Sequence, residues 1–202
     1  MSDKFGIFGP SKQEIWKQLA QELDADFVAG GFRRKDKVVA YHRNWVITLD
    51  TYVVSNGKTS QTLTRIRAPY VNRDDFLFTI YRENFFTNIG KFFGLKDVVV
   101  GYPEFDDAFI IQGNDERKLK MMFSNPKIRE LISYQPAIHL QLKDDEGWFQ
   151  PKFPEGINEL YFQVHGVIKD IVRLHDLYDL FTEVLDHLCE IGTAYEDDPA
   201  TI

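Results

Sequence analysis

The fold of this chain is decided by one stretch, residues 44–68, which reads NWVITLDTYVVSNGKTSQTLTRIRA. Both arms of the stretch are rich in β-branched and aromatic residues, which favour strands. Asn56-Gly57 lies between the arms, and this dipeptide favours a two-residue type I′ turn because both central positions need a positive φ. The stretch therefore predicts a tight antiparallel hairpin in which Val54 faces Thr59.

The same register defines a core-facing side of the hairpin. It places Ile47 opposite Ile66 and Leu49 opposite Thr64. Because successive strand residues point to opposite faces, Trp45, Ile47 and Leu49 should share one side. We expect that side to be buried.

The reverse side of the hairpin is polar and carries two arginines next to each other. Arg65 and Arg67 lie there with Thr48, Asp50 and Tyr52. In the predicted register Asp50 is diagonal to Arg65, which is close enough for an ion pair. A solvated ladder of charges is the favoured interpretation, and an anion-binding surface at Arg65 and Arg67 is the alternative.

Outward from the hairpin, apolar periodicity predicts the remaining elements. A capping box of Ser11 and Glu14 opens a helix over about 11–25. Further strands are predicted at 38–41, 76–81, 98–100, 108–111, 138–142 and 160–164, with a turn at 101–107 and a half-exposed 138–142 strand. Further helices are predicted at 85–93, after Asn114 or Asp115, at 126–134 and at 171–190, the last with Asp170 as its cap and a buried stripe that includes Leu174 and Leu185.

These elements predict an α+β fold in one domain, residues 1–202, with an acidic, frayed tail at 196–202. We expect a largely antiparallel sheet of six to eight strands, an N-terminal helix and two short central helices. A long C-terminal helix should pack on the sheet.

Composition narrows the classes of function. The formal net charge is −7, from 24 basic and 31 acidic side chains, which opposes binding to nucleic acid. Cys189 is the single cysteine, so no intramolecular disulfide can form, and no segment has the length of an apolar membrane span. We therefore expect a cytoplasmic protein. A protein partner or a homo-oligomer stays open, and no small-molecule ligand is specified.

Two further groups of charged residues are candidate sites. Arg33 and Arg34 follow Gly30 and Gly31, where an exposed loop is favoured over an anion site. Glu104, Asp106 and Asp107 offer paired carboxylates for acid–base chemistry, although turn residues are the simpler interpretation.

Motifs for a cofactor or a metal are weak. Phosphate-binding glycine motifs and a nucleophile elbow are absent from the sequence, so we expect no cofactor. On the last predicted helix, His175 and His187 are twelve residues apart, too far in height and angle to share one ion. The acidic run 144–146 lacks the spacing of a calcium loop and is interpreted as a turn.

Residues 101–116, GYPEFDDAFIIQGNDE, carry a resemblance to a known group of proteins. The stretch resembles the central motif of a family of uncharacterised bacterial proteins, in which a phenylalanine-aspartate pair precedes a strand ending in glycine and then an acidic helix start. Residues 38–68 and 101–190 are similar in order to that family's pattern, without the membrane segments that some members carry. The resemblance implies a bacterial origin and an α+β fold, and it supplies no catalytic residues.

The sequence thus favours a non-catalytic binding or regulatory module, because structural signals are strong and no reactive group is assembled. One alternative is a metal-assisted hydrolase that combines the carboxylates of 104–107 with His139 or His165. Another is a self-associating protein that uses the aromatic 85–93 helix or an open sheet edge.

Overall fold

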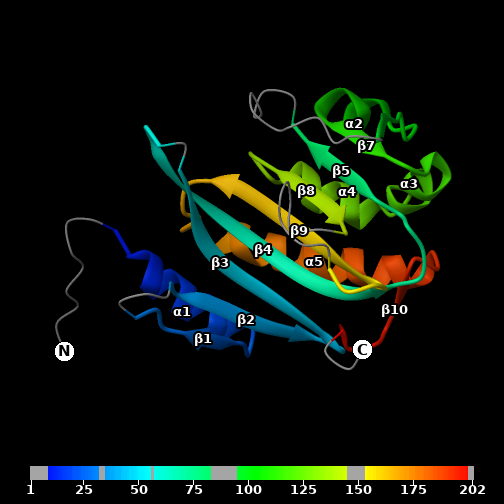
Figure 1. The fold of residues 1–202 in the computed structure, drawn as a ribbon. Helices are drawn as coiled ribbons and strands as arrows, with labels where there is room; N and C mark the ends of the chain where they lie inside the picture. The colour runs from blue at the N-terminus through cyan, green and yellow to red at the C-terminus, as the bar shows by residue number, and fades with distance from the viewer. Residues whose placement is uncertain (1–8, 32–34, 56, 83–94, 145–152, 200–202) are drawn as a thin grey trace.

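The computed structural model describes residues 9–31, 35–55, 57–82, 95–144 and 153–199, which form one sheet and five helices (Figure 1). The helices are α1 (Lys12–Glu22), α2 (Pro103–Ala108), α3 (Glu116–Met122), α4 (Pro126–Ser133) and α5 (Ile171–Glu190). The strands are β1 (Asp26–Val28), β2 (Lys37–His42), β3 (Trp45–Ser55), β4 (Ser60–Asn72), β5 (Phe78–Tyr81), β6 (Lys96–Asp97), β7 (Ile110–Gly113), β8 (His139–Lys143), β9 (Ile157–His165) and β10 (Ala194–Tyr195).

Within the described residues the sheet has ten strands in the order β1-β2-β3-β4-β9-β8-β5-β7-β6, with β10 paired to the end of β4. Every pairing between these strands is antiparallel. The predicted α+β class with a largely antiparallel sheet is confirmed. The sheet exceeds the predicted six to eight strands because β1, β6 and β10 are two or three residues long, too short for a detectable alternation.

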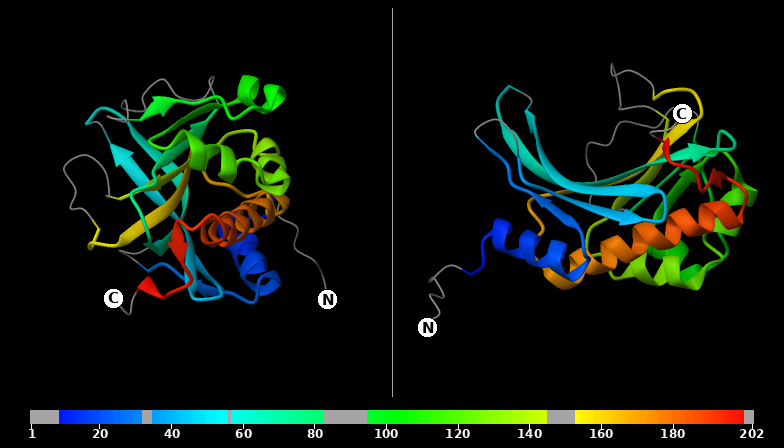
Figure 2. Two further views of the ribbon diagram at one scale, coloured as in Figure 1. Left: turned by 90° about the vertical axis from the view of Figure 1, so that its right-hand side faces the viewer. Right: turned by 90° about the horizontal axis from the view of Figure 1, so that it is seen from below.

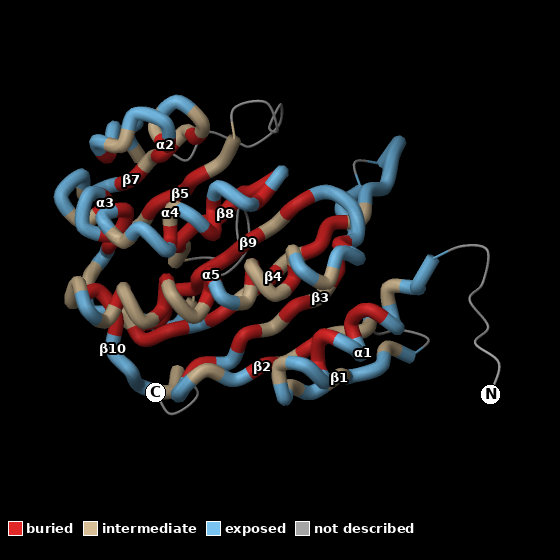
Figure 3. Tube along the Cα trace, turned by 180° about the vertical axis from the view of Figure 1, so that it is seen from behind, coloured by how far each residue is buried: buried red, intermediate tan, exposed pale blue. Residues whose placement is uncertain are grey.

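Three helices lie on one face of the sheet (Figure 2). Helix α5 runs along this face, with α1 and α4 beside it. The indole of Trp16 in α1 donates a hydrogen bond to the carbonyl of Ile168, 3.1 Å away, which ties the N-terminal helix to the segment before α5. The central strands β8 and β9 are buried along most of their length (Figure 3).

Helix α5 has the predicted limits, and the Asp170 carboxylate accepts the N–H groups of Val172 and Arg173 at 3.0 and 3.1 Å. Its buried surface is wider than the predicted stripe, because α1 and α4 pack beside it in addition to the sheet. The additional buried side chains are Leu177, Leu180 and Val184.

The hairpin between β3 and β4 forms with a different register from the predicted one. Ser55 pairs with Ser60, so four residues connect the strands and the two-residue turn is wrong. Leu49 consequently pairs with Ile66, and Asp50 lies directly opposite Arg65. The register differs by two residues, which preserves the facing of every side chain, and the predicted burial of Trp45, Ile47 and Leu49 is confirmed.

Three local predictions near the middle of the chain are wrong. Residues 101–107 are no turn, because Pro103 begins α2, a position that favours proline. Residues 98–100 are not a strand, since the strand before α2 is β6 at Lys96–Asp97. The central helices therefore number three among the described residues, and the predicted helix over 85–93 lies outside those residues.

Two predictions about exposure and length also need correction. Strand β8 is predicted to be half-exposed, yet residues 139–142 are all buried, since β8 lies inside the sheet between β5 and β9. Helix α1 ends at Glu22 rather than near residue 25, since Asp24 has a φ of 51°, which terminates the helical path. The Ser11–Glu14 capping box is confirmed.

Strand β7 meets helix α3 at very close range. The strand ends at Gly113, and the Asp115 side chain accepts the N–H of Lys118 at 3.0 Å to start α3. A Cβ atom added to Gly113 would lie 2.6 Å from Cδ1 of Leu119. Any side chain at position 113 would therefore force Leu119 to shift, and glycine allows this approach of helix to strand.

Candidate functional site

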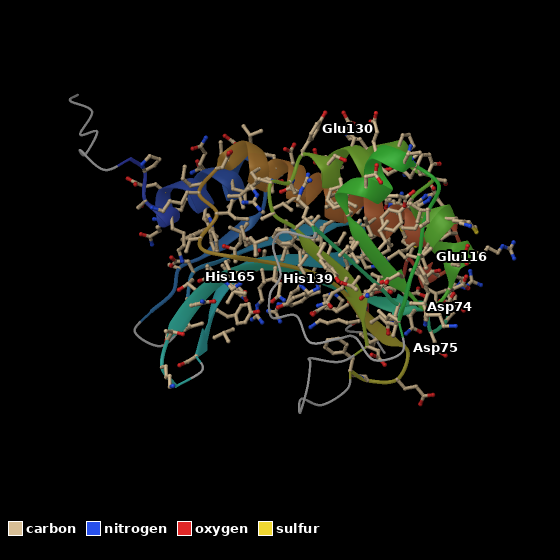
Figure 4. All side chains as sticks on the ribbon, turned by 90° about the horizontal axis from the view of Figure 1, so that it is seen from above. Asp74, Asp75, Glu116, Glu130, His139 and His165 are labelled. Carbon is tan, nitrogen blue, oxygen red and sulfur yellow. The ribbon has the colours of Figure 1, made fainter. Side chains whose placement is uncertain are left out.

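The sheet register aligns polar side chains into two adjacent rows on the face opposite α5. The first row crosses β3, β4, β9, β8, β5 and β7 with Thr48, Arg67, Tyr161, Gln141, Thr79 and Gln112. The second row contains Asp50, Arg65, Gln163, His139 and Tyr81. We call these two rows, together with Tyr52, the polar face. Figure 4 shows His139 near the middle of the sheet, with Glu130 on the helical side.

A carboxylate between two guanidinium groups forms one end of the polar face. Arg65 donates from Nε to Oδ1 of Asp50 at 2.6 Å and from Nη2 to Oδ2 at 3.1 Å. Arg67 donates from Nη2 to the same Oδ2 at 3.2 Å. Burial lowers the pKa of Arg65, but the hydrogen bond and charge of Asp50 outweigh it and leave the pKa raised. Two cations thus share one anion.

A chain of neutral hydrogen bonds continues from this end toward β5. The hydroxyls of Tyr52 and Tyr161 both donate to Oε1 of Gln163, the second at 3.2 Å. The amide of Gln163 then donates from Nε2 to Nδ1 of His139 at 3.0 Å. Since Nδ1 accepts, Nε2 of His139 carries the proton and donates to Oγ1 of Thr79 at 3.1 Å. The tautomer of His139 is fixed by its neighbours.

Burial keeps these groups neutral. It lowers the pKa of His139 to about 4, and the positive charge of Lys143 acts in the same direction. It also raises the pKa of the Tyr161 hydroxyl, and the neighbouring Tyr52 adds to that effect. At neutral pH the middle of the polar face is an uncharged hydrogen-bonding surface.

An ion pair flanks Tyr161 on the other side of the first row. Nζ of Lys143 lies 3.1 Å from Oε1 of Glu159 and 3.9 Å from the centre of the Tyr161 ring. The ammonium group therefore forms a cation–π contact with the ring. This pair adds one positive and one negative charge to the surroundings of the polar face.

Two buried polar atoms of the first row have no hydrogen-bond partner among the described residues. They are Nε of Arg67 and Oε1 of Gln141, and the Gln141 residue is only 6% exposed. Both residues pair with Tyr161, so they flank it on neighbouring strands, with Cα atoms about 10 Å apart. An unsatisfied buried polar atom costs about 1–3 kcal/mol. Buried atoms of Trp45, Tyr70 and Asn158 are also without a partner among the described residues, but they do not belong to the polar face. The pair in the first row is therefore the indication of a binding site on this face.

The other predicted site residues are placed differently. Arg33 and Arg34 lie outside the described residues, as do Asp145 and Glu146. Asp106 accepts the backbone N–H groups of Val100, Gly101 and Tyr102 at 2.8, 2.9 and 2.8 Å. Its carboxylate thus holds the loop before α2, while Glu104 and Asp107 lie on the same short helix.

The histidines and acids of α5 contact side chains of neighbouring elements or of α5 itself. His175 contacts Glu22 of α1 at 2.6 Å, and Glu183 accepts from Asn125 at 2.7 Å. His187, near the other end of α5, contacts Glu190 at 2.7 Å. Across the ranges that the structure describes, no three side chains of His, Cys, Asp or Glu gather as metal ligands would.

One half of the polar face is predictable from the sequence, and the other half is not. Strand alternation alone places Arg65, Arg67 and Asp50 on one side of the hairpin. The alternating polar residues of β8 and β9, such as His139 and Gln163, are a visible signal, but alternation of this kind is also typical of a strand exposed on one side. Their burial depends on strand order, which the sequence does not display.

Comparisons with known proteins add a likeness in fold. No protein-family model matches the chain, and no curated protein sequence matches it. The crystal structure of the mycobacterial trehalose monomycolate transport factor A, TtfA, is similar with a TM-score of 0.56. The match covers 91% of this chain and 98% of that one at 8% sequence identity, so it concerns the fold alone. None of the helices in the described ranges has the length and apolar character to cross a membrane.

Proposed function

We propose that this chain is a non-catalytic binding module and that the polar face is its ligand surface. The observation that carries the proposal is the pair of unpartnered, buried atoms in one row, Arg67 Nε as a donor and Gln141 Oε1 as an acceptor, neither of which has a partner among the described residues. Strands hold the backbones of both residues, so the groups lie in one row before a ligand arrives. A ligand with one acceptor and one donor would complete both.

The chemistry of the surrounding groups favours binding over catalysis. With its pKa lowered to about 4, His139 is uncharged at neutral pH and is a weak base, and both of its nitrogens are engaged. The carboxylate of Asp50 is occupied by Arg65 and Arg67. The metal-assisted hydrolase has little support, because Asp106 engages its carboxylate with backbone N–H groups.

Two further parts of the proposal come from the sequence and from the likeness in fold. The single cysteine favours the cytoplasm, and residues 101–116 favour membership of the family of uncharacterised bacterial proteins. The structurally similar protein, TtfA, is named as a transport factor for trehalose monomycolate. We extend to this chain only the idea that such a fold serves a role of binding and handing over a molecule.

A ligand screen with a matched control tests the proposal. Small polar molecules are added to the isotope-labelled protein, and chemical shifts are recorded by NMR. We expect binders to shift signals of Tyr161 and Gln141, and Gln141→Leu to abolish those shifts. The control is Gln21→Leu on the exposed surface of α1, which lies on the other side of the sheet from the polar face. Binders that map elsewhere, or a screen with none, would contradict the proposal.

A further inference from the structure

We infer that the ligand of the polar face is a small oxyanion that also carries a hydroxyl group, such as a phosphate group or a hydroxycarboxylate, bound at Arg67. The inference rests on the proposed function and names the class of ligand for that same surface. It comes from the balance of charges and of hydrogen-bonding groups around Tyr161.

The charge balance leaves room for one anion. Arg65, Arg67 and Lys143 bring three positive charges, against the two carboxylates of Asp50 and Glu159. One positive charge is left over around Tyr161, although the whole chain carries a net charge of −7. At the far end of the first row, Gln112 donates to Asp97, which adds a negative charge there. A local excess of this sign attracts an anion, and the low polarity of a half-buried site strengthens the attraction.

The hydrogen bonds to Asp50 indicate that the unpaired positive charge lies on Arg67. Asp50 accepts two hydrogen bonds from Arg65 and only one from Arg67, so the guanidinium of Arg65 is paired more fully than that of Arg67. A guanidinium presents its donors as a planar fork that matches two oxygens of a carboxylate or phosphate. In Arg67, Nε is free of partners among the described residues, while Nη2, the other donor on that edge of the fork, donates to Asp50.

The neighbouring Gln141 adds the requirement for a hydroxyl. Its Oε1 is an acceptor, which a bare carboxylate cannot satisfy, whereas the O–H of a hydrogen phosphate or of a hydroxy acid can. The side chain of Arg67 is 30% exposed, so a ligand meets this end of the row from solvent. Nε of Arg67 and Oε1 of Gln141 are themselves buried, so both side chains must shift for a ligand to contact these two atoms. The pair therefore selects for an acceptor and a donor in one small molecule.

Three probes separate this inference from its competitors. Inorganic phosphate carries charge and a hydroxyl, acetate carries charge alone, and trehalose, the sugar that forms part of the TtfA name, carries hydroxyls alone. Each is titrated into the protein at constant ionic strength and followed by NMR. We expect saturable binding of phosphate at Tyr161 and Gln141, at least tenfold weaker binding of acetate, and no saturation with trehalose.

Two substitutions with opposite expected effects on phosphate affinity sharpen the test. Arg67→Gln should weaken phosphate binding at least tenfold. Asp50→Asn should strengthen it several-fold, because the carboxylate that competes for the guanidinium groups is removed. The control is Arg117→Gln on the exposed surface of α3, which should leave the affinity unchanged. Circular dichroism checks that each variant is folded, and Arg67→Lys, which keeps the charge but loses the fork, provides a second variant.

The outcomes distinguish failure of the inference from failure of the proposed function. Phosphate binding that is equally strong in Arg67→Gln, or weaker in Asp50→Asn, would overturn the inference that the ligand is an oxyanion. Saturable binding of trehalose at Gln141 in place of phosphate would overturn it too, while the binding module stands. If neither these probes nor the wider screen reaches the polar face, both proposals fall.

Discussion

The two faces of this sheet are built from the same strands, yet they achieve burial by different means. Toward α5, strand β9 presents Leu160 and Phe162, which need only matching shapes around them. Toward the other side it presents Tyr161 and Gln163, whose polar atoms need partners at defined distances. An apolar face tolerates many arrangements, whereas a polar face depends on one register.

Removing a large side chain from the apolar face should have the largest effect. Phe162 is fully buried and pairs with Ile66 and Leu140. We expect Phe162→Ala to lower the free energy of unfolding by about 3–5 kcal/mol through lost contacts and a cavity. Urea denaturation measures this. A loss smaller than that of Gln163→Ala, one residue along on the polar face, would refute the contrast between the faces.

Acid should weaken the polar face before the apolar one. The pKa of His139 is lowered from 6.5 to about 4 in the folded protein. Between these two pH values the unfolded chain binds a proton at His139 that the folded chain does not bind. Stability should therefore fall as the pH drops from about 6.5 toward 4, by about 2 kcal/mol at pH 5. Unfolding curves at pH 7 and pH 5 measure the loss, and His139→Gln should remove it. An equal loss in that variant would assign the effect to other groups.

Breaking the ion pairs of the polar face should cost less. Asp50 is 15% exposed and binds both arginines, so Asp50→Asn leaves Arg65 and Arg67 facing each other without a counterion. We expect a loss of about 1.5 kcal/mol, the usual scale for hydrogen bonds to charged groups. The loss should shrink in high salt, which screens the two like charges. Thermal unfolding at low and high salt checks both points, and a salt-independent loss would point to packing.

The smallest effect should come from one hydroxyl. Tyr52→Phe removes a donor to Gln163, but Tyr161 still donates to the same oxygen. We expect a loss of about 1 kcal/mol or less in the free energy of unfolding. Tyr161→Phe is the matched comparison, and its larger effect would confirm that the buried hydroxyl matters more. The reverse order would mean that the half-buried hydroxyl of Tyr52 contributes more than the buried one of Tyr161.

Local chemistry made much of the fold predictable. The caps at Ser11 and Asp170 act within one helical turn, so their residues can be recognised without knowledge of the fold. The alternation that exposes Asp50, Arg65 and Arg67 on one side is equally local. The contacts of His139 with Gln163 and Thr79 could not be foreseen, because they depend on β8 lying between β9 and β5.

The hairpin register shows a related limit. A difference of two residues leaves each side chain on its own side of the sheet, so the apolar pattern is satisfied by either register. The observed register differs from the predicted one in two pairings: Asp50 lies directly opposite Arg65 on the polar face, and Leu49 lies opposite Ile66 on the apolar face. Alternation alone predicts neither pairing.

The contact of Gly113 with Leu119 has a consequence for how sequence change can spread through this molecule. Even a single methyl group at position 113 would have to displace Leu119 or lift α3 away from β7. Leu119 is itself fully buried against the core, so the disturbance would reach the packing beneath the sheet. A side chain at 113 would therefore need a smaller or displaced residue at 119, and its Cβ atom would also lie 3.1 Å from the carbonyl oxygen of Leu77.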